Sequence, residues 1–299
     1  VGTGSQSSTT LDPELAAAGM AREQSSCVTQ APSGVGLPAL EHVTARVVSV
    51  TSLGESEHAM LPGYSLATEV YAGQTRRAGG FWRSRVRIAY PLRILEPRVT
   101  HLWNSFGGEV FRLGFLNAVR LEAMEVPEAW LNRFPGPRHG REGVFARLGV
   151  RGRPLFCRSC RPAVGLSAGD MAAINAEVLR GGFDAIKDDE LTYGEATAPF
   201  AERVRVLGEL KKRIEDETGE RKLYFANLID DPVQALDMLP LVERAGADGV
   251  LLAPALQGAG FLSDLRRRTE LLLLAHNVWE DLFDRHPRFG VGRDWYLRM

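Results

Sequence analysis

The stretch GGFDAIKDDE, residues 181–190, decides the fold of this 299-residue chain. A short apolar run at residues 183–186 leads directly into four charged residues, Lys187 to Glu190. A run of this kind is typical of a buried strand in a parallel sheet. In a βα barrel the carboxyl ends of the strands carry the active site. The stretch therefore predicts an α/β fold with its chemistry at the end of this strand.

Four further apolar runs flank this strand along the chain. They occupy residues 154–160, 223–227, 249–253 and 271–276, and segments with helical periodicity lie between the runs, at residues 168–180, 199–218, 232–245 and 262–269. Alternating apolar strands and amphipathic helices predict a parallel sheet with right-handed crossovers. A complete eight-unit barrel needs about 250 residues. The five strands therefore predict an incomplete TIM-type βα barrel at residues 138–299.

The first part of the chain has a mixed pattern and predicts an α+β domain at residues 1–137. Its first 12 residues are small and polar, which predicts a loose lead-in. A helix is expected to begin after the cap residue Asp12. Further elements expected in this domain are strands at residues 45–50, 65–71, 85–90 and 117–125 and a helix near residues 101–106. In the second half of the chain, one more helix is expected at residues 278–285, after the last strand. The turn-rich run at residues 134–140 marks the domain boundary.

Composition excludes several classes of protein. Hydrophobic residues make up 44% of the chain and charged residues 24%, which excludes a disordered or fibrous protein. With 36 basic and 37 acidic residues the net charge is −1, so we expect neither nucleic acid nor an anionic membrane as a partner. No apolar run approaches the roughly 20 residues of a membrane span. Three cysteines are too few for a disulfide framework, so a reducing cytoplasm is expected.

The charged residues after the strand predict a metal site. Strand alternation puts Lys187 and Asp189 on one side and Asp188 on the other, and the following turn can direct Glu190 back toward them. Two carboxylates with oxygen donors favour a hard cation such as Mg²⁺. Lys187 has two interpretations: it is a salt-bridge partner, or its uncharged amine reacts with CO2 to give a carbamate, a third oxygen ligand. Without further context, charges after a strand most often form only a solvated turn.

Several motifs make the chain similar to the ribulose-bisphosphate carboxylase (Rubisco) large-chain family over most of residues 12–299. They are GRPLFCRSCRPAVGLSAGD (152–170), RGGFDAIKDDE (180–190), NSFGGEVF (104–111), AVRLEAMEVP (118–127), FPGPRHG (134–140), YFAN (224–227) and LLLLAH (271–276). The resemblance implies an α+β domain followed by a TIM-type barrel. It implies that Lys187 is carbamylated and binds Mg²⁺ with Asp189 and Glu190. It also implies a homodimer whose active sites lie between the N-terminal domain of one subunit and the barrel of the other.

The departures from the family pattern near the metal site concern basic groups. Carboxylases of the family have lysine-proline-lysine where this chain has Arg161-Pro162-Ala163. Arginine keeps its proton in proteins, so Arg161 cannot act as a base. It can still serve as a fixed cation for an enolate, a carboxylate or a phosphate. Ala163 removes the second amine.

Other departures concern substrate contacts. Glu109 stands where the carboxylases have an asparagine that contacts metal and substrate, and Cys27-Val28-Thr29 replaces glycine-threonine-tryptophan. His276 matches a site histidine, but Asn277 replaces the arginine that normally follows it. By resemblance, Arg161, Glu109 and His276 are substrate-binding candidates. The departures are typical of the form IV Rubisco-like proteins, which do not fix CO2.

The resemblance implies a Mg²⁺-dependent enzyme that forms an enediolate or enolate from a phosphorylated ketose or an oxo-sugar acid. An isomerase, enolase or decarboxylase fits this description, with the Lys187 carbamate or His276 moving the proton. We expect a C-terminally truncated piece of a longer product whose own activity is weak. The alternative is an inactive relative with a binding or scaffold role.

The remaining motifs give weaker predictions. Asn227, at the end of a strand, is either a substrate contact or a loop cap. Cys157 and Cys160 have the spacing of a redox or zinc pair, but residues three apart on a strand face opposite sides, which favours a structural role. The glycine-rich run at residues 257–260 either lets a ligand approach the backbone closely or forms a tight strand-to-helix turn, and the turn is favoured. The arginines at residues 266–268 predict a solvated helix face.

Overall fold

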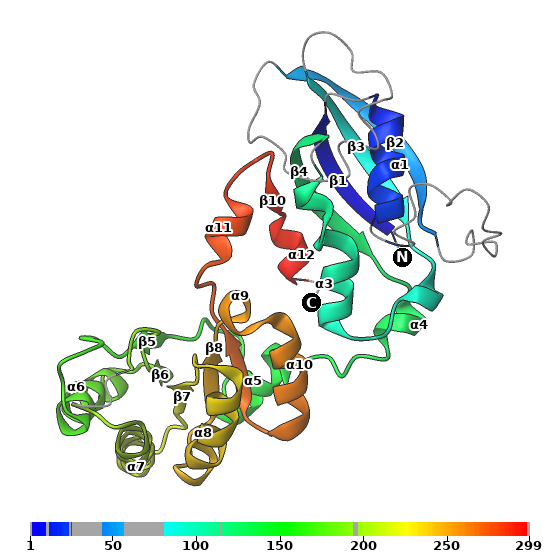
Figure 1. Ribbon diagram of the computed structural model, residues 1–299. Helices are drawn as coiled ribbons and strands as arrows, with labels where there is room; N and C mark the ends of the chain where they lie inside the picture. The colour runs from blue at the N-terminus through cyan, green and yellow to red at the C-terminus, as the bar shows by residue number, and fades with distance from the viewer. Residues whose placement is uncertain are drawn as a thin grey trace. The chain divides into compact units, whose positions relative to one another are not determined.

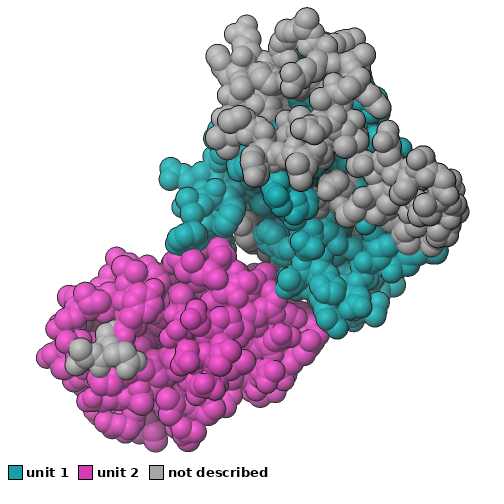
Figure 2. Space-filling view, viewed as in Figure 1, with its two compact units in different colours: residues 1–134, 279–299 teal, residues 135–278 magenta. Residues whose placement is uncertain are grey.

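The computed structural model describes residues 2–9, 12–23, 25, 44–56, 81–113, 115–193 and 197–297. The chain divides into two compact units, which Figure 2 shows in different colours. Unit 1 comprises Val1–Phe134 with Trp279–Met299, and unit 2 comprises Pro135–Val278. The division at residue 134 lies close to the predicted boundary at residue 137, but residues 279–299 belong to unit 1 and were expected in the barrel half.

Unit 1 is built on a five-stranded sheet in the order β10-β4-β1-β3-β2 (Figure 1). The strands are β1 (Gly2–Thr9), β2 (Arg46–Ser56), β3 (Phe81–Ala89), β4 (Leu116–Glu125) and β10 (Gly290–Val291). All pairs are antiparallel except β10 with β4. The helices of this unit are α1 (Pro13–Glu23), α3 (Val99–Gly107), α4 (Glu128–Leu131), α11 (Glu280–Asp284) and α12 (Arg293–Leu297), with 3-10 turns η1 (Leu92–Ile94) and η2 (Val110–Arg112). Asp12 caps α1 as predicted, since its Oδ1 accepts the N–H of Glu14 at 3.0 Å.

The prediction that residues 1–12 are a loose lead-in is wrong. Residues 2–9 form β1, which lies between β3 and β4 in the middle of the sheet. A strand with two neighbours is held by its main-chain N–H and C=O groups, so it needs no apolar alternation of its own. Thr9 is fully buried, and its hydroxyl donates to the carbonyl of Phe115 at 2.6 Å. The strand expected at residues 65–71 and the motif at residues 27–29 lie outside the described residues.

Residues 279–297 join the rest of unit 1 through a buried aromatic side chain. Trp295 is fully buried, and its ring meets that of Phe106 edge to face at 5.8 Å. Val291 of β10 pairs with Leu121 of β4. Arg120 adds a hydrogen bond from Nη1 to the carbonyl of His286 at 2.7 Å. The expected helix at residues 278–285 is present as α11. Because Trp295 is buried in unit 1, α11 belongs to that unit and not to the barrel half.

Unit 2 contains the predicted parallel sheet, with five strands in chain order, β5-β6-β7-β8-β9. The strands are β5 (Cys157–Ser159), β6 (Ala185–Lys187), β7 (Leu223–Asn227), β8 (Gly249–Leu252) and β9 (Leu272–Ala275). The helices are α5 (Gly140–Leu148), α6 (Ala168–Arg180), α7 (Phe200–Thr218), α8 (Pro232–Arg244), α9 (Pro254–Gln257) and α10 (Ala259–Arg268). The α/β fold class and the alternation of strand and helix are confirmed. In the described part of the chain, no helix has both the length and the apolar character needed to cross a membrane.

Local signals explain where the helices of unit 2 begin and end. Ser167 and Asp170 form a capping box at the start of α6, each side chain bonding to the backbone N–H of the other. Gly219 ends α7 in the left-handed conformation, with φ of 71°. The apolar face of α7 buries Leu207, Leu210 and other side chains in the same core as β6, β7 and β8. This core holds the strand ends that carry the site.

Gly208 in the middle of α7 gives a stability prediction. A methyl group at this position would overlap the backbone carbonyl oxygen of Ala245, which follows α8. Gly208→Ala is therefore expected to lower the free energy of unfolding by about 1–3 kcal/mol, because a packed helix pair must separate. Alanine would otherwise favour a helix by about 1 kcal/mol over glycine. Urea denaturation measures the change.

The matched control is Gly169→Ala in the first turn of α6. There the added carbon would meet nothing closer than the Ser167 hydroxyl at 3.7 Å, an ordinary contact. We expect this variant to be at least as stable as the wild type. Equal stability of the two variants would show that α7 and α8 do not approach as closely as described.

Candidate active site

The predicted site residues of unit 2 gather at the carboxyl ends of the parallel strands. Lys187 is the last residue of β6, and Asp188, Asp189 and Glu190 follow it. Arg161 comes two residues after β5, Asn227 ends β7, and His276 follows β9. The carboxyl ends of parallel strands all lie at the same edge of the sheet, so residues far apart in the sequence meet there.

Asp188 points to the opposite side of β6 from its neighbours, as strand alternation predicts. It is fully buried. Its carboxylate accepts hydrogen bonds from Arg203 Nε at 3.1 Å, from the Tyr224 hydroxyl at 3.2 Å and from the Asn227 N–H at 3.0 Å. Arg203 lies in α7 and its side chain is only 2% exposed. Asp188 therefore ties the end of β6 to β7 and α7 and holds the site loop in place.

Asp189 is engaged by three donors. Its Oδ2 accepts from Arg161 Nε at 2.7 Å and from the Ser159 hydroxyl at 3.0 Å, and its Oδ1 accepts from the Leu191 N–H at 3.1 Å. The Asp189 side chain is 1% exposed and that of Arg161 is 64% exposed. Burial acts to raise the pKa of Asp189, but the hydrogen bonds from Leu191, Arg161 and Ser159 outweigh it and hold the pKa below its usual range. Asp189 is therefore ionised.

Glu190 lies within reach of three basic side chains. Its Oε2 is 3.2 Å from Lys187 Nζ and 3.4 Å from His276 Nε2, and its Oε1 is 3.6 Å from Arg161 Nη2. Burial acts to raise the pKa of Glu190, but its own backbone N–H and Lys187 outweigh burial and lower that pKa. Arg161 thus reaches both carboxylates of the predicted metal site.

The surroundings of His276 indicate which ring nitrogen carries hydrogen. Its Nδ1 lies 3.2 Å from the backbone nitrogen of Val278 and accepts that N–H. In the neutral ring the hydrogen then sits on Nε2, which faces Glu190. The backbone N–H of His276 bonds to the Leu252 carbonyl at 2.7 Å and fixes the end of β9 against β8. His276 is therefore placed as a hydrogen-bond donor at Nε2.

The side chains of Lys187, Asp189 and Glu190 fit a divalent metal ion only if Lys187 is carbamylated. Within the described residues, no three His, Cys, Asp or Glu side chains are placed to hold a metal ion. The two carboxylates Asp189 and Glu190 are balanced by Lys187 and Arg161. Carbamylation would turn Lys187 from a cation into an anion, so that Lys187, Asp189 and Glu190 together would offer a divalent cation three anionic oxygen ligands.

Asn227 acts on the backbone of the site loop. Its Nδ2 donates to the carbonyls of Asp189 at 3.2 Å and Glu190 at 3.4 Å, and its Oδ1 accepts from the Ile229 N–H at 2.9 Å. Both ends of the amide are therefore occupied within the protein. Of the two interpretations of Asn227, these contacts favour the loop cap.

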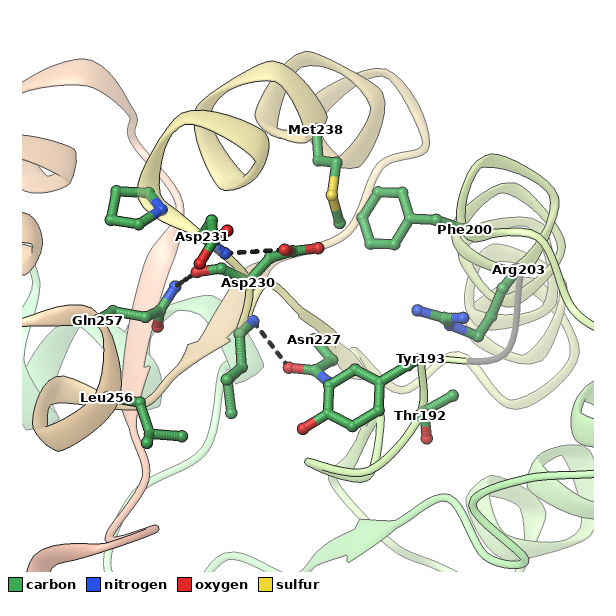
Figure 3. Close-up of a pocket in the computed structure, with 12 residues that line it drawn as sticks. Thr192, Tyr193, Phe200, Arg203, Asn227, Asp230, Asp231, Met238, Leu256 and Gln257 are labelled. Carbon is green, nitrogen blue, oxygen red and sulfur yellow. Dashed lines mark hydrogen bonds between the residues drawn. The ribbon is translucent and has the colours of Figure 1, made fainter.

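A cavity of about 600 Å³ opens beside Asn227 at the ends of β6 and β7 (Figure 3). The Arg203 guanidinium points toward it, and Tyr193 lies across its mouth from Met238. Its lining residues are Thr192, Tyr193, Phe200, Arg203, Asn227, Ile229, Asp230, Asp231, Pro232, Met238, Leu256 and Gln257. The exposed carboxylates Asp230 and Asp231 make this rim unfavourable for a phosphate.

Glu109 belongs to unit 1, whereas the cluster described above consists of unit 2 residues. Its carboxylate accepts from Arg112 Nη1 at 2.9 and 3.0 Å, and half of the side chain is exposed.

Sequence reasoning missed Ser159, Tyr224 and Arg203. Ser159 lies two residues before Arg161, so period-2 alternation along the strand would have placed both on the same side. Arg203 interrupts the apolar face of α7 between Phe200 and Val204, and a charge at such a position indicates a buried partner. Tyr224 reads as an ordinary core residue of a strand, and nothing in its local sequence indicates the contact with Asp188.

The cysteine pair shows no sign of a redox or zinc site. Cys157 is exposed and Cys160 is buried, and both are free thiols. Burial raises the pKa of the Cys160 thiol, with a further contribution from Asp188, which makes the thiol unreactive. The prediction of a strand-to-helix turn at residues 257–260 is wrong, because this run joins helix α9 to helix α10. Gln257, the last residue of α9, accepts the Ala253 N–H and donates to the Leu228 carbonyl.

Comparison with known proteins identifies relatives of this chain. The profile of the ribulose bisphosphate carboxylase large chain, catalytic domain, matches residues 142–299. The ribulose bisphosphate carboxylase of Archaeoglobus fulgidus is 34% identical over 213 residues, covering 70% of this chain and 48% of the relative. The 3-oxo-isoapionate-4-phosphate decarboxylase of Rhizobium etli is 30% identical over 254 residues, covering 85% of this chain and 58% of the relative.

Among solved structures, a rubisco-like protein from Burkholderia fungorum superposes with a TM-score of 0.87 at 30% identity, covering 99% of this chain and 70% of that chain. The chain spans about half the length of the curated relatives it matches. Because the catalytic-domain profile matches more than half of the chain, the chain belongs to the ribulose bisphosphate carboxylase large-chain family.

Proposed function

We propose that this protein is a Rubisco-like enzyme that forms an enediolate or enolate from a phosphorylated ketose or an oxo-sugar acid and does not fix CO2. The observation that carries the proposal is the convergence of Lys187, Glu190 and His276 at the strand ends. Lys187 Nζ and His276 Nε2 lie 3.2 and 3.4 Å from the same oxygen of Glu190. An amine, a carboxylate and an imidazole are all groups that can accept or donate a proton in catalysis.

The predicted cofactor is Mg²⁺, held by Asp189, Glu190 and a carbamate on Lys187. When bound, a divalent cation polarises the substrate carbonyl and stabilises the oxyanion that develops on it. The charge balance described above supports this assignment, since carbamylation supplies the charge that a divalent cation neutralises.

The protein's own residues would orient the substrate and move its proton. The carbamate oxygens of Lys187 would accept the proton from the carbon next to the carbonyl. His276 would donate a hydrogen bond from Nε2 to a substrate oxygen or return the proton there. Arg161 cannot remove a proton, so it would act only as a fixed cation. Asp188 and Asn227 hold the loop and take no part in the chemistry.

The departures from the carboxylases support a reaction other than carboxylation. Arg161 and Ala163 replace two amines, and Glu109 adds a carboxylate where the carboxylases have a neutral amide. A relative that matches 85% of this chain is named a decarboxylase of a phosphorylated oxo-sugar acid. We further propose a homodimer in the cytoplasm, with Glu109 contributing to the active site of the partner subunit.

The charge balance without any metal favours a second candidate, an inactive binding or scaffold protein. Lys187 pairs with Glu190 and Arg161 with Asp189, so each carboxylate has a protein cation as its partner. An intact fold with no metal affinity would support this candidate over the enzyme.

Two assays on the protein test the proposed reaction. With Mg²⁺ and bicarbonate, we expect exchange of the substrate's carbon-bound proton with solvent deuterium, followed by nuclear magnetic resonance, for at least one compound in a panel of phosphorylated ketoses and oxo-sugar acids. Incubation of ribulose bisphosphate with radiolabelled CO2 is expected to leave no labelled acid. Carboxylation at an ordinary enzyme rate of about 1 per second or more would contradict the proposal.

A further inference from the structure

We propose that Arg161 is a built-in cation that competes with the divalent metal for Asp189, so that metal binding requires its guanidinium to leave the carboxylate. This inference rests on the proposed function, since it concerns the affinity of the same site for its metal. It assigns Arg161 a regulatory role that is separate from any contact with substrate.

The contacts of Asp189 show why the two cations compete. A carboxylate oxygen offers two lone pairs. On Asp189 Oδ2 both are in use, one by Arg161 Nε at 2.7 Å and one by the Ser159 hydroxyl at 3.0 Å. Oδ1 accepts the Leu191 N–H and keeps one lone pair, so the competition concerns Oδ2, the oxygen that faces Arg161. A metal ion that binds Oδ2 must therefore displace one of these donors, and the positively charged one is also repelled by the metal.

The exposure of the pair indicates which partner moves. Asp189 is 1% exposed and held by backbone and side-chain bonds, whereas Arg161 is 64% exposed. The guanidinium can turn into solvent without opening the core, but the carboxylate cannot. In the described part of the chain, the ion partners of Arg161 are Asp189 and Glu190, so nothing else anchors its charged end.

Arginine suits this role better than lysine. Its planar guanidinium presents several N–H donors, and here Nε bonds to Asp189 while Nη2 reaches toward Glu190 at 3.6 Å. It also keeps its charge at any pH at which the protein folds, because the hydrogen bond and the charge of Asp189 raise the pKa of Arg161 further. Metal concentration and carbamylation of Lys187 would then decide which cation occupies the carboxylates.

The test is the affinity for Mn²⁺, a spectroscopic substitute for Mg²⁺, measured by electron paramagnetic resonance at fixed bicarbonate. We expect Arg161→Gln to bind Mn²⁺ at least about tenfold more tightly than the wild type, which corresponds to about 1.4 kcal/mol. Arg161→Lys keeps the charge but lacks the two guanidinium nitrogens that face Asp189 and Glu190. Its Mn²⁺ affinity is expected to lie between those of the wild type and Arg161→Gln. Added guanidinium chloride, far below denaturing concentrations, should weaken binding in Arg161→Gln more than sodium chloride at the same ionic strength.

Arg153→Gln is the matched control. Arg153 precedes β5 and pairs with the buried Asp184, which precedes β6, with Nη1 2.8 Å from Oδ2. This pair therefore joins the same two strands as Arg161 and Asp189, but at their opposite ends. Its removal is expected to leave the Mn²⁺ affinity unchanged. Thermal unfolding of each variant verifies that the protein measured is folded.

Equal or weaker Mn²⁺ binding in Arg161→Gln than in the wild type would overturn the inference. If the wild type still bound Mn²⁺ in a bicarbonate-dependent way, the proposed function would stand while Arg161 lost its role. Absence of binding in both proteins would overturn the inference and the proposed metal chemistry together.

Discussion

Asp188→Ala is expected to lower the free energy of unfolding by about 3–5 kcal/mol, although it removes no residue of the proposed chemistry. The loss arises because Arg203, whose side chain is 2% exposed, would keep a buried charge without its partner. The Tyr224 hydroxyl and the Asn227 N–H would lose their acceptor at the same time. Denaturation in urea, followed by circular dichroism, measures the change.

Two further variants separate the buried pair from a general effect of charge. Arg205→Ala removes an exposed pair with Glu209 on the same helix, α7, and is expected to change stability by about 0.5 kcal/mol or less. The double variant Asp188→Leu with Arg203→Met replaces the buried pair by apolar side chains and should recover most of the loss. If Asp188→Ala were no less stable than Arg205→Ala, the described burial of Arg203 would be wrong.

Lys187→Ala is expected to weaken Mg²⁺ binding in the presence of bicarbonate by about 100-fold or more. The variant removes the amine on which the carbamate forms, and with it one of three predicted ligands. In the wild type, binding should require bicarbonate, because the carbamate forms by reaction of the amine with CO2. Isothermal titration with and without bicarbonate measures both effects.

Lys211→Ala is the control for this prediction. Lys211 is another half-buried lysine of unit 2, and its Nζ pairs with Asp248 at 2.9 Å, away from the strand ends of the site. Its removal is expected to leave bicarbonate-dependent binding intact. Equal Mg²⁺ affinity with and without bicarbonate in the wild type, or unchanged affinity in Lys187→Ala, would exclude the carbamate.

The fold of unit 2 follows from the sequence because its signals are local. Apolar runs of strand length alternate with amphipathic segments, and the predicted helix at residues 168–180 has the bounds of α6. The capping box at Ser167 and the glycine that ends α7 are read from a few neighbouring residues. The same local order placed Lys187 and Asp189 on one side of β6 and Asp188 on the other.

Elements held by distant partners could not be predicted in this way. β1 has a polar sequence and becomes a central strand through pairing with β3 and β4, which lie about 80 and 115 residues away along the chain. Residues 279–299 follow the last strand of unit 2 in sequence but join unit 1, because Trp295 is buried there.

For the candidate site, the sequence by itself determined which residues are present: the charged run after β6, the histidine after β9, and an arginine where the carboxylases have a lysine. Only the tertiary structure decided what these residues do to one another. It pairs Arg161 with Asp189, directs His276 Nε2 at Glu190, and occupies the Asn227 amide with the site loop. The physical reason is that hydrogen bonds and ion pairs depend on distances of about 3 Å. Those distances are set by how the five strands β5 to β9 pack side by side, and no local pattern along one strand contains them.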